Sequence, residues 1–246
     1  MITACKGLHS PLKSESSPVE VITASSPPFS TREPDRYQAS RLITTAEWPA
    51  NNSESAADTH TVSSFIARDG ERRREEYEYQ RREKIIYIEN PSGHFILLPS
   101  SKIYSDLKEA VNDVSANDPS EEADVSTDRL LNETRQEMIY HRIGSDNLNG
   151  QATTKYRVTV QNSHETTVGR EMLIWVDETL GMPIRSEILD ERAQRVAKIT
   201  TELKDIRLNV AQDFFQIPKD YRKVEAGLIL GRIRGKEQSQ MAAAKK

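Results

Sequence analysis

The sequence predicts an α+β fold that consists mainly of antiparallel β-sheet, and three observations carry this prediction. Several segments combine β-branched and aromatic residues with polar ones in the alternation of half-buried strands. Turn dipeptides that contain glycine join neighbouring segments of this kind, as they do in hairpins. One segment after Ser126 instead has the cap and composition of a short helix, which we expect to cover one face of the sheet.

Length and composition favour one folded domain between unstructured ends. The chain has 246 residues, of which 36% are hydrophobic and 29% are charged, so its core must come from concentrated apolar stretches. We expect a flexible N-terminal tether at residues 1–33, a β-rich domain at residues 34–226 and a C-terminal tail at residues 227–246, which has no pairing pattern.

Charge and residue content exclude several classes of function. A net charge of −4 argues against binding of nucleic acid, and equally against attraction to a membrane by a polybasic surface. No apolar run reaches the ~18 residues that a membrane-spanning helix needs. The single cysteine excludes an internal disulfide, and the five histidines are scattered, so we expect no metal site and no cofactor.

The first residues have two interpretations, which the sequence leaves open. Ile2, Thr3, Ala4 and Cys5 have the order of a bacterial lipobox, in which the cysteine carries a lipid. Only four residues stand before Cys5, whereas a secretory signal needs a basic start and an apolar stretch, so Cys5 is otherwise a lone thiol in a floppy terminus. The Ser- and Pro-rich stretch that follows resembles the tethers between lipid anchors and folded domains, which favours export.

The first half of the domain reads as a series of strands and hairpins. A strand is expected over residues 36–48, and Asp69-Gly70 joins strands at about 60–68 and 71–80 because both central positions of such a turn need positive φ. Pro91-Ser92-Gly93 joins a further pair at 84–89 and 94–98. The acidic stretch from Ala110 to Asp128 is expected to form a loop or a frayed helix, and the Ser126 cap starts the helix that ends near Glu137.

The second half continues the same sheet. Asn149-Gly150 is another hairpin turn, and the strand at 172–176 is apolar on both faces, which predicts that both of its faces are covered. Gly181 can supply the positive φ of the next turn, and Pro183 can open the returning strand at 184–189. A long strand at about 194–208 follows, and residues 213–218 close the domain.

Residues 156–224 resemble the outer-membrane lipoprotein carrier (LolA-like) superfamily. The resemblance rests on the Trp-Val-Asp strand end at 175–177, the Thr-Leu-Gly-Met-Pro turn at 179–183, a long strand, and the terminal Phe-Phe-Gln-Ile-Pro-Lys-Asp-Tyr at 214–221. It covers about a third of the chain closely. It implies an antiparallel β half-barrel over helices whose concave side holds acyl chains or other apolar ligands, a fold that also serves in periplasmic stress-sensing regulators and mycobacterial lipid-handling lipoproteins.

The polar clusters of the sequence argue against catalysis. The charged run at 71–78 places opposite charges on each face of a strand, where they largely cancel. Asp177 and Glu178 are adjacent, so they point to opposite faces and fit a turn better than an acid-base pair. Ser163, His164 and Glu165 are contiguous and cannot converge on one substrate atom, and no Gly-x-Ser-x-Gly elbow is present. We therefore expect that this protein is not an enzyme.

The sequence therefore predicts a non-catalytic protein of the bacterial cell envelope that binds a lipid or acyl chain. The alternative is a regulator or structural lipoprotein that fills the half-barrel with its own side chains and recognises another envelope protein. We expect contact with a membrane only through a lipid on Cys5, and no binding of nucleic acid. The candidate cavity residues, each of which could equally be ordinary core, are Phe95, Leu97, Tyr156, Val158, Val160, Ile174, Trp175 and Val176.

Overall fold

Long strands account for most of the fold. The computed structural model describes residues 20–24, 26–49, 57–79, 83–110, 138–160, 171–192 and 195–233. In these ranges the strands are β1 (Glu20–Ala24), β2 (Arg36–Pro49), β3 (Asp58–Asp69), β4 (Arg72–Tyr79), β5 (Glu83–Asn90), β6 (Gly93–Leu98), β7 (Ile103–Asp106), β8 (Met138–Leu148), β9 (Gln151–Val160), β10 (Glu171–Asp177), β11 (Pro183–Arg192), β12 (Arg195–Arg207) and β13 (Arg222–Lys223). The described helices are η1 (Pro99–Ser101), η2 (Leu107–Ala110), η3 (Gln212–Phe215) and an α-helix at residues 226–233.

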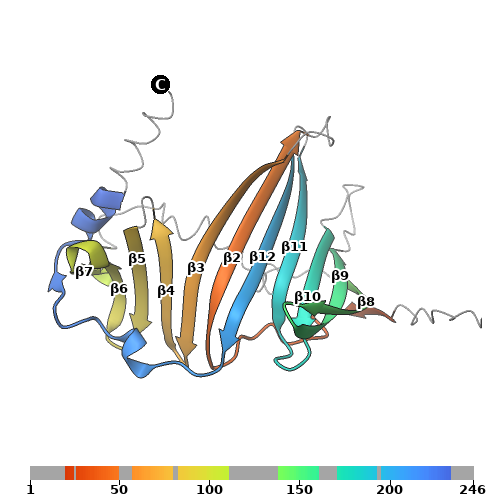
Figure 1. Cartoon of the computed structure of the whole chain (residues 1–246), viewed down its shortest axis with the longest axis horizontal. Coiled ribbons are helices and arrows are strands. Elements are labelled where there is room, and N and C mark those ends of the chain that lie inside the picture. The colour runs from red at the N-terminus through yellow and green to blue at the C-terminus, as the bar shows by residue number, and fades with distance from the viewer. Residues whose placement is uncertain are drawn as a thin grey trace, which may run out of the picture.

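All of the described strands belong to one sheet. Its order is β1-β8-β9-β10-β11-β12-β2-β3-β4-β5-β6-β7-β13, so the long pair β12–β2 joins the two halves of the chain in the middle (Figure 1). Each pair is antiparallel except β7–β13, which is parallel. The prediction of a mainly antiparallel sheet, in which the earlier hairpins and the later meander form one layer, is confirmed.

Turn residues explain why the hairpins form where the sequence predicts them. In the β3–β4 turn, Asp69 pairs with Arg72, so the central positions are Gly70 and Glu71, and the prediction of positive φ at both Asp69 and Gly70 is wrong. Gly70 alone of these residues has a positive φ, 64°, and Gly181 in the β10–β11 turn has a φ of 67°. Asn149 and Gly150 both have positive φ, 55° and 85°, as a type I′ turn between β8 and β9 requires. Pro183 opens β11 at the bulge beside Val176, where its missing N–H costs little.

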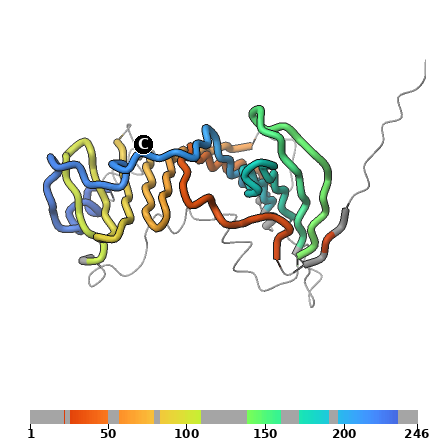
Figure 2. Tube along the Cα trace, turned by 90° about the horizontal axis from the view of Figure 1, so that it is seen from below, coloured from red at the N-terminus to blue at the C-terminus, as the bar shows by residue number. Residues whose placement is uncertain are grey.

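The sheet is curved and has two distinct faces. Figure 2 shows that the edge with β1 and β8 curls toward the side on which residues 26–35 lie, and we call this side the concave face. Residues 208–221 run along the opposite, convex face (Figure 2). Because successive side chains of a strand point to opposite faces, the cross-strand register assigns each side chain to one of the two.

The C-terminal helix covers the concave face at the β5–β7 end. Ile229 and Ile233 of residues 226–233 pack on Ile85, Ile96 and other side chains of β5–β7. The prediction of no pairing pattern from Gly227 onward is therefore wrong for residues 227–233, because their apolar side chains recur at a four-residue helical spacing. Strand β1 likewise lies within the expected tether, and it pairs with β8.

The segment after β12 seals the convex face at the same end. Phe214 and Phe215 pack near Phe65 and Ala67 of β3, and residues 217–221 contact the cluster of Ile86, Ile88, Phe95 and Leu97. Asn90 Nδ2 donates to the Phe215 carbonyl at 2.9 Å, and Arg74 Nη1 donates to the Phe214 carbonyl at 2.8 Å. These bonds from β4 and β5 fix the segment across the sheet. The helix predicted after Ser126 lies outside the described residues.

Ile229→Ala should destabilise the protein by roughly 2–4 kcal/mol, because it leaves a cavity in a closed core. Ile229 is 0% exposed, whereas its neighbour Leu228 is 47% exposed and makes a matched control. Leu228→Ala should change the free energy of unfolding by less than about 0.5 kcal/mol. Urea denaturation of both variants measures the difference. Equal, small losses would show that residues 226–233 do not belong to the core.

Candidate functional site

An apolar cluster on the concave face lies where β8, β9 and β10 meet. We call it the β8–β10 cluster: its buried members are Met138, Tyr140, Val158, Ile174 and Val176, and Ile22, Phe29, Tyr156 and Met172 pack against them. The cross-strand pairs Tyr140↔Val158 and Tyr156↔Ile174 place these side chains next to one another. Phe29 contributes an aromatic edge, with its ring centroid 6.0 Å from that of Tyr140 and 5.2 Å from that of Tyr156.

Apolar side chains extend this cluster across the middle of the sheet. The register pairs Val158 with Met172, Met172 with Ile188, and Ile188 with Ile199, which forms one row from β9 to β12. Beyond it, Ile43 of β2 and Ile66 of β3 lie on the same face. Ile199, Ile43, Ile66 and Leu203 are only partly buried. The concave face therefore offers a strip of partly exposed apolar side chains between its two closed ends, interspersed with Thr45, Thr201 and the Arg41–Glu75 ion pair.

One rim of the concave face is closed by the strap, which we define as residues 26–35. The backbone of Ser30 donates to the Gly181 carbonyl at 3.0 Å, and Gly70 donates to the Asp35 carbonyl at 2.7 Å, so the strap is tied to turns in both halves of the sheet. In the middle, Phe29 enters the β8–β10 cluster. The strap thus links the apolar end of the face to β3 and β4.

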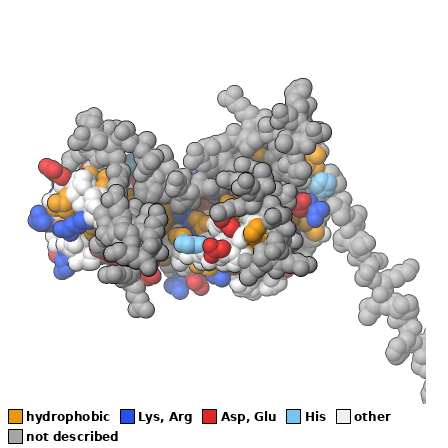
Figure 3. Space-filling view, turned by 90° about the horizontal axis from the view of Figure 1, so that it is seen from above, with side chains coloured by type: hydrophobic (Ala, Val, Ile, Leu, Met, Phe, Trp, Pro, Cys, Tyr) orange, Lys and Arg blue, Asp and Glu red, His pale blue; other side chains and the backbone are white. Residues whose placement is uncertain are grey.

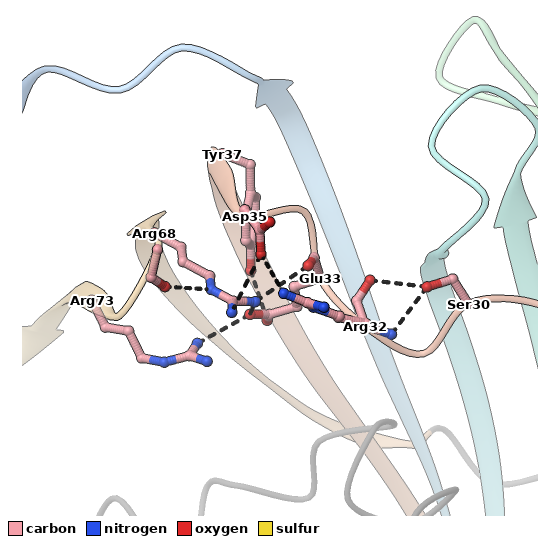
Figure 4. Close-up of polar contacts among 8 residues, drawn as sticks. Ser30, Arg32, Glu33, Asp35, Tyr37, Arg68 and Arg73 are labelled. Atoms are coloured by element: carbon pink, nitrogen blue, oxygen red, sulfur yellow. Dashed lines mark hydrogen bonds and ion pairs between the residues drawn. The ribbon is translucent and has the colours of Figure 1, made fainter.

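Glu33 fixes the strap to the sheet, as Figure 4 shows. Its Oε1 accepts a hydrogen bond from Tyr37 Oη at 2.7 Å, and its Oε2 accepts one from Arg73 Nη1 at 3.1 Å. Arg68 Nη1 donates to the Glu33 carbonyl at 3.2 Å. Burial raises the pKa of Tyr37 far above its usual range, and the charge of Glu33 adds to the effect, so the phenol stays a proton donor.

A second polar contact lies on the concave face beside the apolar strip. Arg41 on β2 pairs with Glu75 on β4, and its Nη2 also donates to Tyr77 Oη at 3.3 Å. Burial raises the pKa of Tyr77, and the nearby Glu75 charge raises it further. Glu33 of the strap and Glu75 of β4 therefore each have an arginine partner on the concave face.

The eight predicted cavity residues do not line one surface. Tyr156, Val158, Ile174 and Val176 come together in the β8–β10 cluster. Phe95 and Leu97 lie on the convex face, where they pack with Ile217 and Tyr221, because they alternate with the concave residue Ile96. Trp175 also points to the convex face, between Ile174 and Val176 in sequence. The side chain of Val160 and the whole of Cys5 lie outside the described residues.

Trp175 explains how both faces of β10 are covered, as the sequence predicts. It is 5% exposed, and Lys155 and Arg185 from the neighbouring strands stack on its ring, at 4.4 Å and 5.1 Å from the centroid. Its Nε1 donates to Asp146 Oδ2 at 2.9 Å. Cationic side chains rather than a second layer cover this face, so Trp175 has no access to the concave strip.

The charged residues that the sequence singles out form ion pairs and turns. On β4, Arg74 pairs with Glu76 at 2.8 Å on the convex face, which agrees with the expected cancellation of charge. Asp177 is a turn residue, as expected: its Oδ1 accepts from the backbone of Thr179 and Leu180 at 2.8 and 2.7 Å. Among the described side chains visible from above, acidic, basic and hydrophobic groups are intermixed (Figure 3). Residues 163–165 lie outside the described residues.

Sequence reasoning missed the strap, although it carries Phe29 and Glu33. Residues 26–35 contain three prolines, Ser30 and Thr31, and they have no strand or helix period, so they read as part of the tether. The one local signal is Phe29, an aromatic residue among polar and small neighbours. Its partners Tyr140 and Tyr156 are too distant in the chain for any local pattern to reveal the contact.

The described part of the chain contains no group of three or more His, Cys, Asp or Glu side chains placed to hold a metal ion. None of its helices combines the length and apolarity needed to cross a bilayer.

Comparisons with known proteins return structural likeness but no relative by sequence. No family model matches the chain, and no curated protein matches it. A LolA superfamily protein from Nitrosomonas europaea is similar over 78% of this chain and 94% of its own, with 13% identity and a TM-score of 0.32. The MucA/MucB complex structure of Pseudomonas aeruginosa matches 76% of this chain and 58% of its own, with 15% identity and a TM-score of 0.37. The lipoprotein LppX of Mycobacterium tuberculosis matches 69% and 89%, with 14% identity and a TM-score of 0.31.

Acidification should change the fluorescence of Trp175 with a midpoint below pH 3.8, the ordinary value for an aspartate. The hydrogen bond from Trp175, followed by that from the Asn147 backbone, lowers the pKa of Asp146. The carboxylate contact is therefore present above pH 3.8 and is lost only as the pH falls through the lowered pKa.

The measurement is the emission of a Trp48→Phe variant, in which Trp175 is the one remaining tryptophan, as a function of pH. Adding Asp146→Asn should abolish the transition, because the amide does not titrate in this range. A midpoint at or above pH 3.8, or a transition that survives Asp146→Asn, contradicts the assignment of this contact.

Proposed function

We propose that this protein is a non-catalytic component of the bacterial cell envelope that binds a lipid or a lipoprotein acyl chain on its concave face. The observation that carries the proposal is the set of partly exposed apolar side chains Ile199, Ile43 and Ile66, which lie on the concave face of the central strands beside the row Val158, Met172 and Ile188. An open strip of this kind between two closed ends fits a long, narrow ligand better than a compact one. The same ligand class is what the resemblance of residues 156–224 implies.

The energetics suit an acyl chain. Burial of apolar surface contributes about 0.8 kcal/mol per methylene, so ten buried methylenes supply about 8 kcal/mol before the costs of association. Such binding needs no polar partner, and the strip supplies Ile43, Ile66 and Ile199, with the small polar residues Thr45 and Thr201 on the same face. The ligand would lie on Ile199, Ile43 and Ile66, with the four predicted residues of the β8–β10 cluster as its wall.

The alternative function, an envelope regulator or structural lipoprotein that recognises another protein, has one observation in its favour. Both ends of the concave face are filled by the chain itself: Phe29 packs in the β8–β10 cluster, and Ile229 and Ile233 fill the β5–β7 end. A half-barrel filled in this way would present the remaining strip to a partner protein. Lipid analysis of the purified protein separates the two functions, since the alternative predicts no bound lipid.

Attachment of a lipid to Cys5 is a separate part of the proposal. It would hold the domain at a membrane through the preceding tether and place it in the envelope. Intact-mass measurement of protein from a membrane fraction tests it, with Cys5→Ser as the control. If the intact mass of envelope-associated protein shows no added lipid, the proposed anchor at Cys5 is ruled out, while the proposed concave site is unaffected.

Ile199→Glu should weaken binding of a fluorescent fatty acid by at least about tenfold, because it buries an unpaired carboxylate under the ligand. Leu189→Glu is the matched control: Leu189 is 36% exposed and lies on the convex face, since the register alternates it with Ile188. The control should bind as the wild-type protein does. Displacement titrations of both variants measure the effect. Equal affinity in the two variants would exclude the concave strip as the binding surface.

A further inference from the structure

A cavity of about 260 Å³ lies on the sheet where β4, β5 and β6 adjoin. Its lining differs from the apolar strip, because it carries charges of both signs and two tyrosines. Its polar and charged lining residues are Arg73, Glu75, Tyr77, Tyr87, Glu89 and His94. All six lie on the concave face by the register of β3 to β6. The cavity therefore opens to the same side as the proposed acyl-chain site.

The lining is ordered along the strands. The outer row consists of Arg73, Glu89 and His94, which lie opposite one another across β4, β5 and β6. The next row pairs Glu75 with Tyr87, and Tyr77 lies one row further along β4. Along the strands the cavity thus changes from an ionic row to a mixed row and a tyrosine, and Leu107 also lines it.

The charged groups of the outer row can still form hydrogen bonds with a ligand. The Arg73 side chain is 51% exposed and donates one N–H to Glu33, although a guanidinium has five donors. The Glu89 side chain is 44% exposed, with one carboxylate oxygen 3.4 Å from His94. Arg73 points to the strap instead of to Glu89, its neighbour across the β4–β5 pair. An anionic and a cationic group of one ligand can therefore each meet a partner here.

The two charges suggest which ligand suits them. Arg73 and Glu89 lie directly opposite each other on adjacent strands, and neither side chain is fully used by a partner within the protein. A phosphoethanolamine group carries a phosphate and an ammonium on one two-carbon bridge, so it presents one charge of each sign to neighbouring residues. Arg73 suits the phosphate, while Glu89 suits the ammonium by its charge and the tyrosine rings suit it through cation–π contacts.

We infer that this cavity is a head-group site for a zwitterionic phospholipid, an inference that rests on the proposed function. Its place in the register connects the two. Glu75 lies directly opposite Ile66, the partly exposed residue of β3 at the end of the apolar strip. A lipid whose head group occupies the cavity extends its acyl chains past Ile66 and over the Arg41–Glu75 ion pair toward Ile43 and Ile199. The protein thereby selects among lipids by head group and not by chain alone.

Competition against a fluorescent fatty acid tests this inference with three lipids that carry the same dioleoyl chains. Phosphatidylethanolamine should compete about tenfold better than phosphatidylglycerol or diacylglycerol, because it alone satisfies Arg73 and Glu89 together. Glu89→Gln should reduce competition by phosphatidylethanolamine to the level of phosphatidylglycerol and leave competition by diacylglycerol unchanged. Arg73→Gln should weaken competition by both phospholipids, again without affecting competition by diacylglycerol.

Glu171→Gln is the matched control, since it also removes a half-exposed strand carboxylate that faces a basic partner, Arg157, at 3.0 Å. It should leave all three competitors unchanged, and constant diacylglycerol binding shows that each variant is folded. Equal competition by the three lipids in the wild-type protein overturns the head-group site while the apolar site stands. A Glu89→Gln variant that keeps the preference overturns it as well. If none of the three lipids displaces the bound fatty acid, the head-group site is overturned too, and if the fatty acid itself does not bind, the proposed function fails.

Discussion

The structure depends on the register of one continuous sheet, which assigns each side chain to the concave or the convex face. Met172, Ile188 and Ile199 share the concave face because they pair directly across three strands, and a slip of one residue would turn all of them away. The long pair β12–β2 carries this register from one half of the chain to the other. The strap, the C-terminal helix and the segment after β12 then cover apolar side chains on the two faces of this sheet.

Closure of the two ends has a consequence for function. At the β5–β7 end Ile229 and Ile233 pack on the concave face, and at the β8–β10 end Phe29 does so. Between them, the partly buried Ile43 and Ile199 have no such cover among the described apolar clusters. The polar anchors Glu33 and Glu75 border this strip and are neutralised by arginines, so they fix the rim without adding unpaired charge.

Local chemistry made most of the fold predictable from sequence. Turns with positive φ, such as Gly70 and Asn149-Gly150, placed the hairpins, and alternation placed the strands between them. Strand β1 and the strap could not be predicted, because they are stabilised by partners far away in the chain. The position of the candidate residues was only half predictable for the same reason: Ile174 and Val176 lie on the concave face, but apolarity alone cannot tell that Trp175 and Phe95 face the other way.

Photo-cross-linking with a diazirine fatty acid, followed by peptide mapping, tests the central claim that an apolar ligand binds the concave face. The account predicts saturable labelling of concave residues of the central strands, Ile43, Ile66 and Ile199, that excess unlabelled fatty acid prevents. Leu189 and Trp175 on the convex face should stay unlabelled, although both are apolar and lie on neighbouring strands. Saturable labelling of the convex residues, or labelling of the concave ones that unlabelled fatty acid does not reduce, would contradict it.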